Sequence, residues 1–232
     1  MAGCEAVADS GWEMRAIFLG PPGAGKGTQA SLLSRRKGVP CFASGDILRE
    51  AVRKGEPVGK EALSYMEAGT LVPDELMTRI LLGRLELVGK AEPFILDGFP
   101  RTRSQAEALE GRLASDQQAP IDVTVDFEIS EEKVIRRLAG RRVCGGCGAN
   151  YHLENLPPKK SGVCDRCGGP LRARLDDEPQ TIRRRMEVYR NQTEPLLEFY
   201  RAQGKLRTIS GDLSVEDQYQ ALLELLKREQ LV

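Results

Sequence analysis

Residues 14–29, MRAIFLGPPGAGKGTQ, join a short apolar run to a glycine-rich loop and then to a helical pattern. Strand, glycine loop and helix in this order build a phosphate-binding loop, because the glycines let backbone amides turn toward an anion at the positive end of the helix. Gly20, Gly25 and Lys26 fit the pattern G-x-x-x-x-G-K-[ST], in which the final hydroxyl ligates Mg²⁺. Gly27 stands in the hydroxyl's place and Thr28 follows one residue late. We therefore predict a phosphate-binding loop in which Lys26 reaches the outer phosphates, and we favour this interpretation above the alternative of a tight turn without a ligand.

Apolar and helical patterns alternate along the rest of the chain. We expect strands at 14–20, 41–44, 94–98, 123–129 and 206–210, and helices over 28–36, after Asp46, over 74–88, after an N-cap at Ser130, and over 214–229. Strands that alternate with helices predict an α/β fold with a parallel sheet covered on both faces. Residues 143–177, rich in Gly, Pro and Cys, break this rhythm and are expected to form a small inserted module.

Charge and hydropathy exclude several classes. Lys and Arg number 34 and Asp and Glu number 34, so a neutral chain of this kind is not expected to bind nucleic acid generally. No apolar run approaches the ~20 residues that span a bilayer. Residues 1–13, MAGCEAVADSGWE, lack the basic and apolar regions of a secretory signal and are interpreted as a short extension. We therefore expect a soluble, cytoplasmic protein that does not bind membranes.

Four of the six cysteines, Cys144, Cys147, Cys164 and Cys167, form two C-x-x-C pairs with 16 residues between them. Two such pairs predict a closed tetrahedral metal site of structural type, although the sequence does not distinguish zinc from iron. His152, the only histidine, is not expected among the ligands. An alternative is a zinc ribbon that binds nucleic acid, since basic residues flank the pairs. That alternative is disfavoured because the ribbon has a single aromatic residue, Tyr151.

A second polar stretch, FILDGFPRTRSQ, covers residues 94–105. Asp97 ends an apolar strand at the sheet edge where ligands bind, so it is a candidate to hold Mg²⁺ through water. Arg101 is a candidate to clamp a second phosphate with both arms of its guanidinium. The alternative is that Asp97 caps the following helix.

The motifs GPPGAGKGTQ, ASGDILREAV, GTLVPDE, LDGFPRTRSQ, GRRVC and DDEPQTIRRR stand in the order and approximate spacing of adenylate kinases. The resemblance covers nearly the whole chain after residue 13, and the cysteine insert resembles the zinc-containing LID of bacterial members. It implies a three-layer α/β/α P-loop core with a five-stranded parallel sheet, formed by residues 14–42, 73–140 and 178–232. An AMP-binding segment at 43–72 and a LID at 141–177 with structural Zn²⁺ would be inserted into this core.

The reaction implied by the resemblance is MgATP + AMP ⇌ 2 ADP, by direct in-line phosphoryl transfer under a closing LID in a monomeric enzyme. A UMP/CMP kinase is the alternative, because it shares the phosphate loop and the DGFPR element. GTLVPDE, Gln105 and the long cysteine insert favour AMP.

The resemblance also assigns residues by position. Those implied for ATP are Gly23, Ala24, Gly25, Lys26, Gly27, Thr28, Arg137, Arg141, Asn150, Tyr151 and Leu213. Those implied for AMP are Ser44, Arg49, Thr70, Leu71, Val72, Gly98, Phe99, Pro100, Arg101, Gln105, Arg174 and Arg185. The catalytic set would be Lys26, Asp97, Arg101, Arg141, Arg174 and Arg185. Arg183 and Arg184, in the same RRR run as Arg185, are expected to lie on a solvated helix face.

Overall fold

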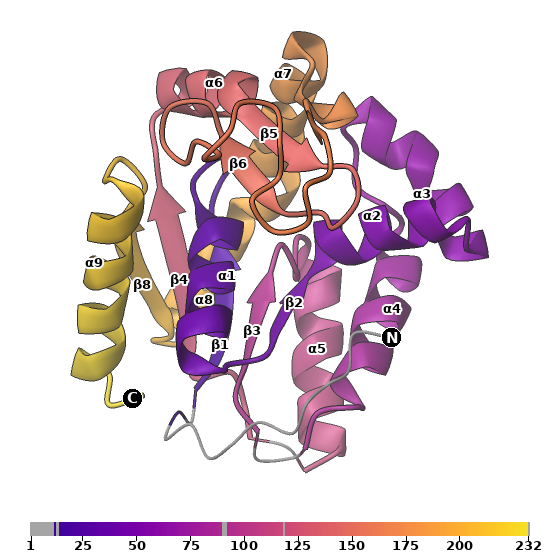
Figure 1. Ribbon diagram of the computed structural model, residues 1–232. Helices are drawn as coiled ribbons and strands as arrows, with labels where there is room; N and C mark the ends of the chain where they lie inside the picture. Colours follow the sequence, from indigo (N-terminus) through magenta and orange to yellow (C-terminus); the bar gives the residue numbers. More distant parts are fainter. Residues whose placement is uncertain (1–11, 13, 90–91, 118, 232) are drawn as a thin grey trace.

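The computed structural model of the 232-residue chain describes residues 12, 14–89, 92–117 and 119–231 (Figure 1). The predicted extension at 1–13 lies outside the described residues except for Trp12.

A five-stranded sheet forms the centre of the molecule. Its strands are β1 (Arg15–Leu19), β2 (Cys41–Ala43), β3 (Phe94–Asp97), β4 (Val123–Glu128) and β8 (Leu206–Ser210). They are arranged in the order β2-β3-β1-β4-β8, and every neighbouring pair is parallel. The five predicted strands are confirmed, although β2 ends at Ala43 because Ser44 already begins a helix. The order places β1, and the loop that follows it, at the middle of the carboxyl edge.

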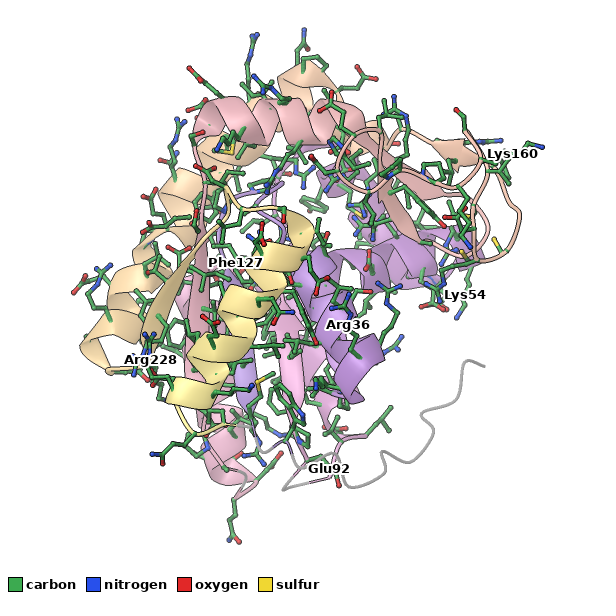
Figure 2. All side chains as sticks on the ribbon, turned by 60° about the vertical axis from the view of Figure 1, so that its left-hand side comes forward. Arg36, Lys54, Glu92, Phe127, Lys160 and Arg228 are labelled. Carbon is green, nitrogen blue, oxygen red and sulfur yellow. The ribbon has the colours of Figure 1, made fainter. Side chains whose placement is uncertain are left out.

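Helices cover both faces of this sheet, as predicted. Ala16 and Phe18 of β1 pack with α1 (Lys26–Lys37) and α9 (Val215–Arg228), whereas Ile17 and Leu19 face the opposite core. That second core includes side chains of α4 (Asp74–Leu85), α5 (Arg103–Ser115) and α8 (Pro195–Ala202). Strict alternation along a strand that is buried on both faces accounts for the continuous apolar run AIFL after Arg15. Figure 2 shows Phe127 on the sheet, while Arg36 and Arg228 stand on the outer helices.

Two insertions lie above the carboxyl edge of the sheet (Figure 1). The first, called the helical segment here, comprises residues 43–72 and contains α2 (Ser44–Lys54) and α3 (Pro57–Ala68). These helices cross closely at Gly59, where an added Cβ would lie 2.3 Å from the backbone of Ala51.

The second insertion, the cysteine segment, comprises residues 141–177 and follows α6 (Glu131–Gly140). It contains a three-stranded antiparallel sheet of β5 (Arg141–Cys144), β6 (Asn150–His152) and β7 (Leu171–Arg172), and it ends in the 3-10 turn η1 (Leu175–Asp177). Pairing of Val143 with Arg172 joins its two ends, as the sequence predicts for a compact module. The chain returns through α7 (Pro179–Val188) and a π-helical turn, η2 (Tyr189–Thr193), to α8. No described helix has the length and apolar character needed to cross a membrane.

Candidate functional site

The loop between β1 and α1 has the geometry of a phosphate cradle. Gly20 has a φ of +132°, and an added Cβ would lie 2.7 Å from the carbonyl oxygen of Phe127, so only glycine fits there. Gly25 is the N-cap residue of α1 with a φ of +103°, and no side chain caps this helix. The first-turn amides of α1 are therefore available to an anion at the positive end of the helix dipole.

Lys26 lies inside this loop. Its Nζ donates to the carbonyl oxygens of Gly20 at 2.7 Å and Pro21 at 2.8 Å. Burial lowers the pKa of Lys26 to about 8, and the charges of Arg101 and Arg185 act in the same direction while Asp97 opposes them. The positive charges of Lys26, Arg101 and Arg185 together suit this loop to a phosphate.

Gly27 is constrained by space and not by its backbone angles. An added Cβ at Gly27 would lie 2.8 Å from Oδ2 of Asp97, the residue that ends β3. The loop therefore has glycine after Lys26 because the Asp97 carboxylate occupies the volume of a side chain. Thr28 follows in the first turn of α1. Burial raises the pKa of Asp97, with the Lys26 charge opposing it.

A cavity joins the phosphate loop to the helical segment. Of the residues predicted for AMP it is lined by Ser44, Arg49, Thr70, Leu71, Val72, Gly98, Pro100, Arg101, Gln105 and Arg185, together with Lys26 of the loop. Phe99 lies in the core beside it and is fully buried, so only its backbone can face a ligand. Arg174 is not among the lining residues. Nearly all of the predicted AMP set is thus brought to one cavity from four separate sequence motifs.

Hydrogen bonds fix the far wall of this cavity. Arg101 donates from Nε to the carbonyl oxygen of Gly98 at 2.7 Å, and its amide donates to Oε1 of Gln105 at 2.8 Å. Gln105 is 1% exposed and donates to Oδ1 of Asp74 at 2.8 Å. Helix α5 is capped by Thr102, whose hydroxyl accepts a hydrogen bond from the backbone N–H of Gln105. The alternative that Asp97 caps this helix is therefore wrong.

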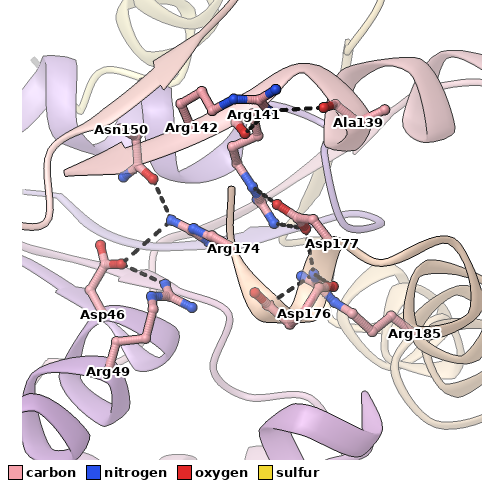
Figure 3. A network of polar contacts seen from close by, with 10 residues as sticks. All are labelled: Asp46, Arg49, Ala139, Arg141, Arg142, Asn150, Arg174, Asp176, Asp177 and Arg185. Carbon is pink, nitrogen blue, oxygen red and sulfur yellow. Dashed lines mark hydrogen bonds and ion pairs between the residues drawn. The ribbon is translucent and has the colours of Figure 1, made fainter. Parts of the chain in front are cut away.

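Four predicted arginines meet carboxylates between the two insertions (Figure 3). Arg141 binds Asp177 through both Nε and Nη2, and Arg185 contacts Asp176 at 3.0 Å and Asp177 at 3.1 Å. Arg174 donates to Asn150 and lies 4.0 Å from Asp46, which also pairs with Arg49 at 2.5 Å. The basic groups of both insertions are therefore gathered in one place.

This network is short of negative charge. Burial lowers the pKa of Arg185 to about 10, and burial together with the charges of Arg141 and Arg49 lowers the pKa of Arg174 well below its ordinary value. Burial alone would raise the pKa of Asp176, but the guanidiniums of Arg185, Arg141 and Arg174 outweigh it, so the pKa falls. Guanidiniums in such surroundings favour a multiply charged anion with planar pairs of oxygens. Arg183 and Arg184 are exposed, as predicted.

Residues predicted for the far end of ATP also lie together. Arg137, on α6, donates to the carbonyl oxygen of Leu213 at 3.2 Å and to that of Gly23 at 3.5 Å. The Leu213 side chain is exposed. This group lies on the α6 side of the phosphate loop, away from the cavity that Ser44 and Gln105 line.

The four cysteines form a single cluster. Their Sγ atoms all lie within 4.8 Å of one another, with 3.4 Å between those of Cys144 and Cys167 and 3.6 Å between those of Cys147 and Cys164. Metal–sulfur bonds of ~2.3 Å in a tetrahedron place sulfurs about 3.8 Å apart, so this set fits a zinc ion. The amides of Cys147 and Arg166 donate to the sulfurs, as expected for thiolates.

Two neighbours of the cluster have defined roles. The hydroxyl of Tyr151 lies 3.4 Å from Sγ of Cys164 and accepts from the Asp165 amide at 2.8 Å, so its side chain supports the cysteines. Nδ1 of His152 accepts from the amides of Glu154 and Asn155, each at 3.0 Å. His152 is thus engaged outside the cluster.

Comparison with known proteins decides the family. A family model described as adenylate kinase matches residues 18–205. The chain belongs to the adenylate kinase family. It is 48% identical over 213 residues to the adenylate kinase of Caldicellulosiruptor saccharolyticus, and the aligned region covers 92% of this chain and 99% of that protein. It is 47% identical over 217 residues to that of Archaeoglobus fulgidus, covering 92% and 100%. For Streptomyces avermitilis the identity is 46% over 217 residues, covering 93% and 98%.

As a member of the adenylate kinase family, the chain is a phosphotransferase with a P-loop α/β fold, which confirms these predictions. The site also contains residues that the sequence analysis did not single out. Met66, Met77 and Tyr189 line the cavity, and Asp176 and Asp46 pair with its arginines. Asp176 and Asp46 stand in the quoted motifs DDEPQTIRRR and ASGDILREAV, whereas Met66, Met77 and Tyr189 stand in none of them.

Proposed function

We propose that the chain catalyses MgATP + AMP ⇌ 2 ADP by direct in-line transfer, with AMP in the cavity under the helical segment and ATP on the phosphate loop. The observation that carries this proposal is the cavity lined by Lys26 on one side and by Ser44, Arg101 and Gln105 on the other. A single transferable phosphate placed near Lys26 would face both nucleotides, which is the arrangement that in-line displacement requires.

On the acceptor side, Gln105 would recognise the adenine, since its amide is held by Asp74 and the Arg101 backbone. Ser44 donates to the Gly98 carbonyl at 2.7 Å and, with Thr70–Val72, would shape the base pocket. Arg49 and Arg101 would hold the AMP phosphate. On the donor side, residues 23–28 would cradle the triphosphate, while Arg137 and the Leu213 backbone would meet the adenine. Asn150 and the backbone of Tyr151 would approach from the cysteine segment, since the Tyr151 side chain packs on the cysteines.

The arginines would exchange partners during the reaction. Arg141, Arg174 and Arg185 are held by carboxylates and by Asn150 in the structure, so they are positioned before the phosphates arrive. The transferred group carries its negative charge on several oxygens, and guanidiniums already gathered at the site would stabilise that charge. Lys26 would leave the carbonyl oxygens of Gly20 and Pro21 for the phosphates.

Two metals complete the proposal. Mg²⁺ bound with ATP would neutralise phosphate charge, and Asp97 at the mouth of the loop offers the carboxylate that would hold it through water. Zn²⁺ held by Cys144, Cys147, Cys164 and Cys167 would be structural, because four sulfur ligands close its coordination shell.

We further propose that residues 141–177 act as a LID and residues 43–72 as the AMP-binding segment, which together exclude water from the reacting phosphates. The remaining described residues would form the core. Reduced cysteine pairs at metal-ligand spacing support a cytoplasmic location. We propose a monomer that binds ATP, AMP and ADP, and the neutral charge balance of the chain supports the absence of nucleic-acid binding.

The test is a coupled assay that offers ATP with AMP, CMP, UMP and GMP in separate reactions. We expect AMP to be phosphorylated at least tenfold faster than the others. Preference for UMP or CMP would favour a pyrimidine nucleotide kinase, and no transfer to any of the four would refute the proposal.

A salt series with single-stranded DNA and RNA tests the nucleic-acid alternative. Binding that appears at low salt and falls steeply with added salt would support it, because released counterions drive such binding. We expect no binding even at low salt.

A further inference from the structure

Helix α9 places one amide side chain directly behind the phosphate loop. Gln218 is 2% exposed, and its Nε2 donates to the carbonyl oxygens of Ala24 at 3.3 Å and Ser210 at 3.1 Å. Its Oε1 accepts from Nε2 of Gln29 at 3.1 Å, and Gln29 also donates to the Val215 carbonyl at 2.9 Å. Each polar atom of this buried amide thus has a partner in the protein, as retention of a polar group in a core requires.

The phosphate loop and the Gln218 side-chain amide are in close contact. Gly25 has a φ of +103°, and a Cβ added there would lie 2.5 Å from Oε1 of Gln218. Residues of α9 around Gln218, including Tyr219 and Leu222, are apolar and pack into the core. An apolar side chain at this position would satisfy the core, so the amide is explained by what it binds and not by packing.

The partners of Gln218 come from the two stretches that the donor nucleotide would span. Ala24 belongs to the phosphate loop, and Ser210 is the last residue of β8, just before the turn that carries Leu213. Gly211 lies between them, with a Cβ position 3.3 Å from the Ala24 carbonyl oxygen. The distance between a triphosphate site and an adenine site would therefore depend on this link.

We propose that Gln218 is a positioning residue for the donor nucleotide, which fixes the phosphate loop relative to the turn at 210–213. This inference rests on the proposed function, in which ATP spans these two stretches. Gln218 is not among the residues that line the cavity assigned to AMP. Its loss should therefore affect ATP and leave AMP binding unchanged.

Two substitutions test the role. Gln218→Leu removes the amide and leaves a branched apolar side chain one atom shorter. Gln218→Met keeps the length of glutamine and offers a more adaptable apolar side chain if the first variant folds poorly. The matched control is Gln220→Leu, on the same helix, because Gln220 is exposed and donates only within α9 to Glu216 at 3.1 Å.

For each protein we would measure KM for ATP and for AMP, kcat, and the Kd of a non-hydrolysable ATP analogue by calorimetry. We expect KM for ATP and the analogue Kd to rise by about three- to tenfold in Gln218→Leu and Gln218→Met, in line with a lost buried hydrogen-bond link. KM for AMP should change less than twofold, and Gln220→Leu should match the wild type.

The analogue Kd does not depend on turnover, so it separates this inference from the proposed function. If the wild type fails to transfer phosphate from ATP to AMP, the proposed function fails. If the analogue Kd is unchanged in both variants, or if ATP and AMP constants rise together, the positioning role of Gln218 is overturned.

Discussion

At Gly27, the lack of space for a single Cβ atom explains why the phosphate loop has glycine after the lysine. A side chain at this position would compete with the Asp97 carboxylate, since the added Cβ would lie 2.8 Å from Oδ2. We predict that Gly27→Ser, which restores the common G-K-S pattern, lowers both activity and stability. Crowding of this kind costs about 1–3 kcal/mol in the free energy of unfolding. Urea unfolding and the coupled assay measure the two effects.

The control for this change is Gly83→Ala. Gly83 lies within α4, and a Cβ added there meets nothing within 4 Å, so the substitution should be neutral or stabilise by about 0.5–1 kcal/mol. A Gly27→Ser variant as stable and active as the wild type would show that Asp97 moves away at no cost.

The pKa of Lys26 sets a pH dependence. Burial lowers this pKa to about 8, so the ammonium is charged below pH 8 and loses its proton above it. Because kcat/KM reports the free enzyme, kcat/KM for ATP should fall about tenfold for each pH unit above about 8. In Lys26→Arg the guanidinium stays charged, so any remaining activity should not show this fall. A wild-type profile that stays flat to pH 10 would contradict the assignment.

At the scale of elements, the sequence predicted those features of the site that are formed by residues close together in the chain. The strand and glycine loop of residues 14–29 were predictable because apolar run, glycines and helix follow one another within a short stretch. The four cysteines were predictable from spacing alone. Gln218 and Met66 were not, because each reaches the site by packing of elements far apart in the sequence.

The RRR run illustrates the same limit. Spacing does not distinguish Arg185 from Arg183 and Arg184, and the resemblance to adenylate kinases alone selected it. In the fold, α7 turns Arg185 inward to Asp176 and Asp177 while the other two remain exposed. Helix orientation, which is set by tertiary packing, makes the distinction.

The cysteine segment has little core of its own. Its buried cluster consists of Cys144, Ala149, Tyr151 and Cys164, and two of these are the proposed ligands. We therefore predict that chelating the metal lowers the melting temperature, by about 6–12 °C if roughly 3 kcal/mol is lost. Hydrogen exchange should rise most, and through local opening, in residues 141–177, and much less in β1 and β4. Absence of bound metal, or equal exchange with and without chelator, would contradict a structural site.

At the scale of the whole molecule, the two insertions already touch above the site. Arg53 of the helical segment donates to the carbonyl oxygen of Gly146, between Cys144 and Cys147, at 2.8 Å. Arg174 approaches Asp46 at 4.0 Å, and Gly69 packs against Thr181 of α7. In the proposed function the LID closes over the site, and these contacts would then favour the closed form in its balance with an open one.

The Arg53 contact offers a measure of that balance. Arg53 is exposed and lies outside the reacting cavity, so Arg53→Ala should weaken closure without touching either nucleotide. A ligand that joins two adenosines through five phosphates engages both insertions, and its Kd should rise about two- to tenfold, as for one exposed hydrogen bond to a charged group. The Kd values of ATP alone and AMP alone should change little. Lys54→Ala is the matched control, because Lys54 pairs with Glu50 on its own helix. Equal losses for the joined ligand and for AMP alone would show that Arg53 acts on the AMP site and not on closure.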